Sequence, residues 1–290
     1  MIVNIKLLKA FVTLAEEGSY HSAADILCLT QSALTKQIQM LEHLIGVTLF
    51  KRGRFGAKLT VTGGLLYSKT SELLKHNYEF LEYVRKLEKG NVGKLALGFG
   101  ISTFQVAPAW VSTFRAQFPD VEVSLNDIPS NVQCRMLLEG KIQVGFIRLP
   151  VPEPLHVEVL FEEKLVLAAR SGVRVDPANI QPVLAIHQLL QINPDRGRGL
   201  AHQTACFLKN NNLNARFASV ADDIHTLLAL IAAGNGVALL PSGVSHFLPT
   251  GVTLAQPEGK HNGWQIGVAW NPEIKDILRD KFLQIVIGET

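Results

Sequence analysis

Cysteine is scarce in this 290-residue chain, and long apolar runs are missing. The three cysteines, Cys28, Cys134 and Cys206, lie far apart without CxxC spacing, which excludes a disulfide framework and a cysteine-based metal site. An odd count with no signal peptide favours a reducing cytoplasm. We expect Cys28 to be a small buried residue that closes a helix. Cys206 has no resolving cysteine nearby in sequence, which favours a core position over redox sensing.

The longest nearly apolar stretch, residues 227–240, is interrupted by a Gly-Asn-Gly sequence. It falls short of the roughly 18 continuous apolar residues that a membrane-spanning helix needs. Near the N-terminus, Lys9 interrupts the apolar region, and Glu16 and Glu17 stand where a cleavage site would lie, which argues against a signal peptide. We therefore expect no membrane partner.

Motifs of the common enzyme classes are also missing. The sequence contains no GxSxG, HExxH, P-loop or dinucleotide-binding motif. His187, His202 and His225 stand apart from one another. No catalytic residue, metal site or cofactor is predicted. An enzyme without these motifs, or a solute-binding protein that uses a C-terminal cleft, stays open as an alternative class.

Positive charge is unevenly distributed along the chain. Residues 1–90 hold 12 Lys and Arg against 8 Asp and Glu, whereas the remainder is nearly neutral. The excess is concentrated in Lys36 and in the segment 51–58, which contains Arg52 and Arg54. A local basic patch on a neutral body indicates a polyanionic partner for one domain.

The first 60 residues show the pattern of three short helices, of which the third is the most informative. Within residues 30–46, Leu34, Ile38 and Leu41 recur at helical spacing and predict a buried face. Another face carries hydrogen-bonding groups, one positive charge and no acid, and its members are Gln31, Ser32, Thr35, Lys36 and Gln39. Such groups suit base edges and phosphates in the major groove. An ordinary solvated helix surface is the alternative.

A basic hairpin follows this helix. Residues 47–50 and 57–61 read as two short strands around a turn that contains glycine. Arg52 and Arg54 would stand at its tip, where they suit the phosphate backbone or the minor groove of DNA.

Residues 62–89 read as one long helix. Apolar positions repeat with steps of four and three, with two polar interruptions, at Leu66, Thr70, Leu73, Asn77, Phe80, Val84 and Leu87. This heptad seam predicts dimerisation through the helix. Packing on the same chain is the alternative.

Beyond residue 90 the pattern becomes α/β. Strands are predicted at residues 94–100, 121–125, 144–147 and 165–169, with helices at 106–118, 135–138 and 224–233. Alternation of this kind predicts mostly parallel sheets covered on both faces. About 200 residues suffice for two such subdomains with a cleft between them.

These features together resemble the LysR-type bacterial transcriptional regulators. The N-terminal positions shared with that family are Phe11, Ala15, Gly18, Ser19, Ala23, Ala24, Leu27, residues 30–35, Gln37, Ile38, Leu41, Glu42, Gly46, Leu49, Phe50, Arg52, Leu59, Thr60 and Gly63. C-terminal landmarks lie at residues 118–119, 138–140, 163–167 and 232–241. Departures are Thr30 and Thr35 for serine, Ser32 for proline, and Gln143 for an acidic residue.

The resemblance implies a winged helix-turn-helix at residues 1–61, a linker and dimerisation helix at 62–90, and an α/β effector domain at 91–290. That domain would comprise two Rossmann-like subdomains arranged as in periplasmic binding proteins. Subdomain I would span about 91–160 and 267–290, and subdomain II about 161–266. The implied partners are double-stranded promoter DNA, a second copy in a homodimer or homotetramer, and RNA polymerase. The implied location is the cytoplasm.

The same resemblance implies a small organic effector in the cleft, a carboxylate in particular. Positions that match family pocket residues are Ser102, Thr103, Ser130, Arg148 and Arg196. In subdomain II the matching segments are residues 193–199 and 220–223. Ser102 and Ser130 are also suited to cap helices, and Arg148 is suited to pair with a carboxylate. Effector binding would then close the cleft and change the geometry of the DNA-bound oligomer.

Overall fold

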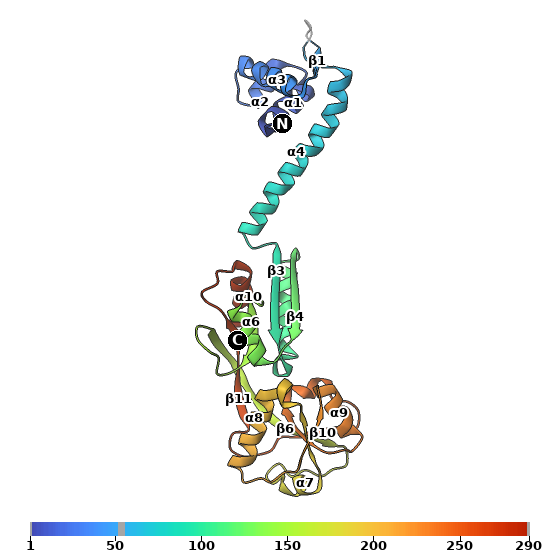
Figure 1. Cartoon of the computed structure of the whole chain (residues 1–290), viewed down its shortest axis with the longest axis vertical. Helices are drawn as coiled ribbons and strands as arrows, with labels where there is room; N and C mark the ends of the chain where they lie inside the picture. The colour runs from blue at the N-terminus through green and yellow to red at the C-terminus, as the bar shows by residue number, and fades with distance from the viewer. Residues whose placement is uncertain (1, 52–55, 289–290) are drawn as a thin grey trace. The chain divides into compact units, whose positions relative to one another are not determined.

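The structure is a computed structural model that describes residues 2–51 and 56–288, without the side chains of residues 194–197, 219 and 220. It contains two compact units, Met1–Glu88 and Lys89–Thr290 (Figure 1). We call them the N-terminal unit and the C-terminal unit. In the described residues, no helix is both long and apolar enough to cross a membrane.

Three helices build the core of the N-terminal unit: α1 (Ile5–Glu17), α2 (Tyr20–Ile26) and α3 (Gln31–Ile45). Their N-caps are Asn4, Ser19 and Thr30, whose side chains accept hydrogen bonds from the first helical turn. Gly18 ends α1 with a φ of 63° and Gly46 ends α3 with a φ of 75°, in the left-handed region that favours glycine. The buried residues of α3 are Leu34, Ile38 and Leu41, as predicted.

The predicted hairpin is present but short. Strand β1 (Phe50–Lys51) pairs antiparallel with β2 (Lys58–Leu59). The prediction of longer strands was wrong because the N–H groups of Leu49 and Phe50 donate to the Glu42 carboxylate instead of a partner strand, at 2.7 and 3.2 Å.

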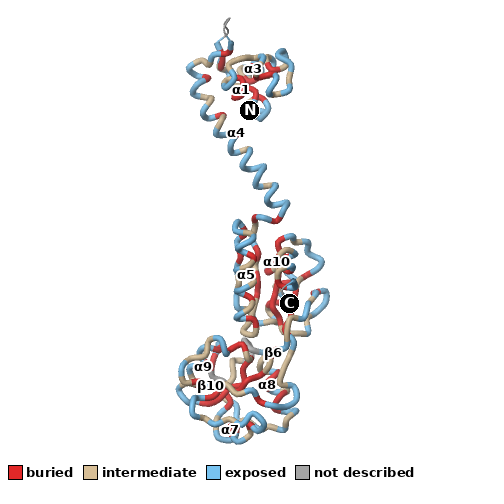
Figure 2. Tube along the Cα trace, turned by 180° about the vertical axis from the view of Figure 1, so that it is seen from behind, coloured by how far each residue is buried: buried red, intermediate tan, exposed pale blue. Residues whose placement is uncertain are grey.

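The long helix predicted at residues 62–89 is confirmed as α4 (Val61–Glu88). Its first half packs on α1 through Leu74 and Thr70, which are buried, and through Leu66. Most of its remaining surface is exposed, as the pale blue colour along α4 shows (Figure 2). The helix therefore packs on its own chain along part of its length and leaves apolar side chains in solvent elsewhere.

The C-terminal unit begins with a sheet of mixed direction. The first group of strands in this sheet, in spatial order, comprises β6 (His156–Arg170), β11 (Gly263–Trp270), β5 (Val144–Arg148), β3 (Gly93–Phe99) and β4 (Val121–Asp127), and the sheet continues beyond β6. Helices α5 (Val106–Gln117) and α10 (Ile277–Gly288) pack on one face through Phe114 and Phe282, and α6 (Ser130–Leu138) packs on the other through Leu137.

The rest of this unit is organised around the second half of β6. That half pairs with β9 (Ala238–Pro241) and β10 (Val252–Ala255), while β7 (Leu189–Ile192) and β8 (Phe217–Ala221) form a separate parallel pair. The accompanying helices are α7 (Gln181–Ile186), α8 (Pro194–Asn210) and α9 (Ile224–Ala232). Two short 3-10 helices complete the unit, η1 (Ile101–Thr103) and η2 (Ser242–Phe247).

The prediction of mostly parallel sheets was wrong. Strands β3, β4 and β5 are parallel, but β11 runs antiparallel to both β5 and β6, and β6 runs antiparallel to β9 and β10. The reason is topological. Strand β6 carries the chain from the first group of strands to the second, and β11 carries it back, so the two run in opposite directions side by side.

Three local predictions were also wrong. Helix α6 begins at Ser130 and not near Arg135. Strand β6 begins at His156, because its first half pairs with β11. Cys28 is exposed, with a φ of 54°, since the turn after α2 directs it away from the core.

Candidate DNA-binding and effector-binding sites

The polar residues predicted to read DNA share one surface of α3. Gln31, Ser32, Lys36 and Gln39 are exposed, and Thr35 is half-buried. The Thr35 hydroxyl donates to the Gln31 carbonyl oxygen at 2.8 Å. Among the described residues, Lys36 has no ion-pair partner, so its charge is available to a phosphate.

The hairpin is fixed to α3 by a residue whose role sequence reasoning missed. Glu42 accepts hydrogen bonds from the backbone of Leu49 and Phe50, and thereby holds β1 beside α3. In the sequence, Glu42 stood out because it is one of the positions shared with the LysR family, but that pattern does not say what the side chain does. Gly56 lies so close to the backbone of Gly18 that a Cβ atom would approach the Gly18 oxygen to 2.5 Å. Lys51 and Lys58 are exposed on the hairpin, whereas the predicted tip residues Arg52 and Arg54 lie outside the described residues.

The C-terminal unit contains a cleft of about 770 Å³. It lies at the carboxyl ends of β3, β4 and β5 and is bordered by residues of α8 and α9. The structure brings Ser102, Thr103, Ser130 and Arg148 together in its lining. The side chain of Arg196, the fifth predicted position, lies outside the described residues.

The two serines do not cap helices. Ser130 is the first residue of α6, and its hydroxyl oxygen accepts from the backbone N–H of Arg148 at 3.2 Å. Ser102 lies inside η1, which has no side-chain cap. Thr103 is buried, and its hydroxyl donates to the Gly100 carbonyl oxygen at 3.1 Å. The prediction of helix caps was wrong because both serines lie inside their helices, whose N-cap positions are occupied by Pro129 before α6 and by Gly100 before η1.

Arg148 is held by neutral groups. Its guanidinium donates to the Gly199 carbonyl oxygen at 2.6 Å and to the Gln203 side-chain oxygen, and it stacks 4.5 Å from the ring centre of Trp264. Burial lowers the pKa of Arg148 below its ordinary value, and the electrostatic interaction with Cys206 opposes this shift. No carboxylate among the described residues forms an ion pair with it.

Acidic residues face the same cleft. Sequence reasoning missed Asp127, whereas Asp222 and Asp223 fall in the segment 220–223 that matches a family pocket segment. Asp127 ends β4, while Asp222 and Asp223 precede α9. Hydrogen bonds from the Thr226 backbone and hydroxyl lower the pKa of Asp223, which caps α9. A sequence feature that could have revealed Asp127 is its position directly after the strand predicted at residues 121–125, because open α/β sheets bind ligands at the carboxyl ends of their strands.

The carboxyl-terminal parts of β3, β4 and β5 are joined by the side chain of Gln133, which sequence reasoning also missed. Its fully buried amide nitrogen donates to the carbonyl oxygens of Phe99, Ile128 and Phe146, at 3.1, 2.7 and 3.2 Å. The side chain lies directly over Gly98 and Gly145, where a Cβ atom would meet its oxygen at 2.8 and 2.7 Å. A larger residue at either position would have to displace the Gln133 side chain.

Gln143, which stands where the family pattern has an acidic residue, still accepts a hydrogen bond through its side chain. Its side-chain oxygen accepts from the Ala96 N–H at 2.7 Å. A carboxylate oxygen would accept the same hydrogen bond, so the departure leaves this link at the edge of β3 in place.

Two protein families match this chain. The model of the bacterial regulatory helix-turn-helix protein, lysR family, matches residues 5–64, and that of the LysR substrate binding domain matches residues 88–277. The HTH-type transcriptional regulator TfdS of Cupriavidus pinatubonensis (strain JMP 134 / LMG 1197) is 30% identical over 250 residues, 84% of each protein. AlsR of Bacillus subtilis (strain 168) is 26% identical over 295 residues, 95% of this chain and 94% of AlsR.

Solved structures give the same result. CbnR, a LysR family transcriptional regulator, aligns with a TM-score of 0.78 at 26% identity and covers 98% of this chain and 100% of its own. Full-length CbnR complexed with its target DNA aligns with a TM-score of 0.80 at 25% identity and covers 99% of each chain. The matched proteins are regulators and not enzymes. The chain therefore belongs to the LysR family of bacterial transcriptional regulators, with a DNA-binding helix-turn-helix followed by a substrate-binding domain.

Proposed function

We propose that α3 reads promoter DNA in the major groove through Gln31, Ser32, Thr35, Lys36 and Gln39, and that Arg52 and Arg54 contact the adjacent backbone or minor groove. The observation that carries this proposal is the exposed polar surface of α3, which carries no acid and whose Lys36 has no ion-pair partner within the described part of the chain. The complex of the relative CbnR with its target DNA supports it.

A salt series with promoter DNA tests the proposal. Fluorescence anisotropy should give a log–log salt slope that falls by about 1 in Lys36→Gln, because one phosphate contact is lost. Lys69→Gln, a change at an exposed lysine on α4, is the matched control and should keep the full slope. Equal slopes for the two variants would remove Lys36 from the interface.

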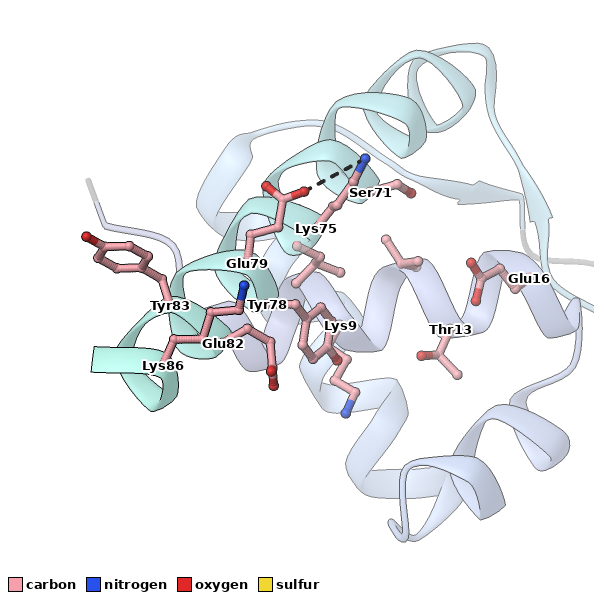
Figure 3. Close-up of a pocket in the computed structure, with 12 residues that line it drawn as sticks. Lys9, Thr13, Glu16, Ser71, Lys75, Tyr78, Glu79, Glu82, Tyr83 and Lys86 are labelled. Carbon is pink, nitrogen blue, oxygen red and sulfur yellow. Dashed lines mark ion pairs between the residues drawn. The ribbon is translucent and has the colours of Figure 1, made fainter. Parts of the chain in front are cut away.

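We propose further that the protein dimerises through α4 and that dimers pair into a tetramer. A groove of about 730 Å³ lies between α1 and α4 (Figure 3), lined by apolar groups such as Val12, Leu74 and Tyr78. Beyond it, Leu73, Phe80 and Leu87 of the predicted seam remain 51, 63 and 44% exposed. A second copy of α4 supplies the apolar surface that such a seam requires.

Sedimentation measurements test this second proposal. Phe80→Glu places a charge in the seam and should shift the protein toward a lower oligomeric state. Lys69→Glu, at a polar position of the same helix, should leave the mass unchanged. An unchanged mass in both variants would mean that other surfaces form the oligomer.

The cleft is proposed to bind a small organic effector whose carboxylate lies against Arg148, with Ser102, Thr103, Ser130 and Arg196 around it. Because β6 and β11 connect the two groups of strands on either side of the cleft, closure would bend these strands and shift the population of DNA-bound states. We place this activity in the cytoplasm, with RNA polymerase as a further partner. The predicted domain limits, 1–61, 62–90 and 91–290, belong to the same proposal.

A melting-temperature screen of organic acids tests effector binding, because a ligand of the native state raises stability by mass action. A ligand found in this way should also change the affinity or footprint on promoter DNA. A ligand that stabilises the protein but leaves DNA binding unchanged would contradict the regulatory role.

A further inference from the structure

The cleft carries opposite charges that lack counterions within the described protein. On this basis we propose that the effector is a zwitterion, whose carboxylate lies at Arg148 and whose protonated amine lies at Asp127. The inference rests on the proposed role of the cleft as the effector site, and it specifies the chemical class of the ligand. A dianion of the same size would satisfy Arg148 and leave Asp127 facing a second negative charge.

The positive end of the site is Arg148. Its guanidinium is half-buried and fixed by the Gly199 carbonyl oxygen, the Gln203 side-chain oxygen and the ring of Trp264. All three partners are neutral, so they orient the cation without compensating its charge. The fork of an arginine held in this way matches the two oxygens of a carboxylate.

The negative end is Asp127, the last residue of β4. Among the described residues its side chain has no hydrogen-bond or ion-pair partner, although it lines the cleft. The surrounding protein partly desolvates it and raises the pKa of the Asp127 carboxyl, and the charge of His225 on α9 opposes this shift. A desolvated carboxylate without a partner is stabilised by a cationic ligand.

The remaining charges of the lining do not favour a dianion either. Arg198 is the second described arginine, His225 is a further basic group, and Asp222 and Asp223 are two further acids. Arg198 and Asp222 each have interactions of their own, and the Asp223 carboxylate is engaged by Thr226. With three acids facing two arginines and one histidine, the described lining has no excess of positive charge to attract a second carboxylate.

Strand register fixes the separation of the two ends. Asp127 pairs with Phe99, and Gly98 pairs with Gly145, so Phe146 is level with Phe99 and Arg148 lies two residues further along β5. Asp127 and Arg148 therefore point to the same face of the sheet, two strands apart. Spacings of about 4.8 Å per strand and about 3.3 Å per residue place their Cα atoms about 12 Å apart. This separation favours an amine and a carboxylate that are several bonds apart.

Matched ligands on the full-length protein test the proposal. At each chain length from three to eight carbons, the ω-amino acid, the dicarboxylate, the monocarboxylate and the monoamine are compared by melting temperature and by calorimetric titration. At six carbons these are 6-aminohexanoate, adipate, hexanoate and hexylamine. We expect the ω-amino acid of at least one length to bind at least tenfold more tightly than the other three molecules of that length.

The variant Asp127→Asn should abolish this advantage and should not weaken the dicarboxylate. Glu122→Gln is the matched control, since Glu122 is an exposed acid on the same strand that pairs with Lys94 outside the cleft. If at every length the dicarboxylate binds as well as the ω-amino acid, or if Asp127→Asn leaves the preference intact, the zwitterion proposal is overturned. Dicarboxylate binding that alters promoter binding would leave the proposed regulatory function standing, whereas a bound zwitterion without any effect on promoter DNA would reject that function alone.

Discussion

Replacement of Glu163 by alanine should destabilise the C-terminal unit and disturb the cleft. Glu163 lies in β6 and is 2% exposed. Its carboxylate accepts from the backbone N–H groups of Lys164 at 2.8 Å, Ser242 at 3.1 Å and Gly243 at 3.4 Å, and from the Ser242 hydroxyl. The side chain thereby fixes η2 to the strand that connects the two groups of strands.

The magnitude follows from these hydrogen bonds. A hydrogen bond to a charged group contributes about 1.5–3 kcal/mol, and a buried donor left without an acceptor costs about 1–3 kcal/mol. Because the donors share one carboxylate, their contributions are not additive. Taking the Ser242 and Gly243 groups as the donors left unsatisfied, we expect a loss of about 3 kcal/mol. For a unit of this size, each kcal/mol lowers the melting temperature by about 2–4 °C, so the expected decrease is about 6–12 °C.

The assay is thermal unfolding of the full-length protein, with Glu162→Ala as the matched control. Glu162 is the exposed neighbour on the same strand, and its removal should change stability by about 0.5 kcal/mol or less. A decrease for Glu163→Ala that is no larger than the control would refute the reasoning from burial and hydrogen bonding.

The same variant should weaken ligand binding. Gly243, in η2, lies against η1, where a Cβ atom would approach the Ile101 oxygen to 2.5 Å. Ile101 and Ser102 in η1 line the cleft. Loss of Glu163 should therefore lower ligand affinity even though Glu163 itself is absent from the lining. The affinity for DNA per monomer should be retained, because α3 belongs to the other unit.

Three further predictions concern single side chains. Glu42→Ala should weaken DNA binding although it removes no positive charge, because the N–H groups of Leu49 and Phe50 lose their acceptor and β1 is no longer held beside α3. Fluorescence anisotropy titration checks this, with Glu72→Ala as the control. Gly145→Ala should lower the free energy of unfolding by about 1–3 kcal/mol, measured by thermal unfolding, since its Cβ would displace the buried Gln133 oxygen. Gly172→Ala meets no neighbouring atom and tests backbone strain alone. Asp127→Asn should raise the melting temperature at neutral pH, because the folded-state pKa of Asp127 is raised. The stability that this group contributes is present below its ordinary value of 3.8 and is lost as pH rises through the raised value, so the difference between variant and parent should vanish in acid.

The local elements were accessible from the sequence because their causes are local. The apolar spacing of Leu34, Ile38 and Leu41 predicted which face of α3 is buried, and Thr30 and Gly46 marked its ends. The heptad spacing of residues 62–89 predicted one long helix, and the structure contains it. Side-chain periodicity and capping depend on neighbours within one or two turns, so they can be recognised without tertiary information.

Only the tertiary structure decided the contacts between distant segments. The direction of β11, the hydrogen bonds of Glu42 to β1, the position of Gln133 over two glycines, and the approach of Asp127 and Arg148 to one cleft all depend on pairings across the fold. Periodicity contains no information about register between strands that are 20 or more residues apart, and a side chain's partners are set by that register. By itself the sequence determined the class of protein and the polar helix that we propose to read DNA, whereas the charges that line the cleft became visible only when the strands were brought side by side.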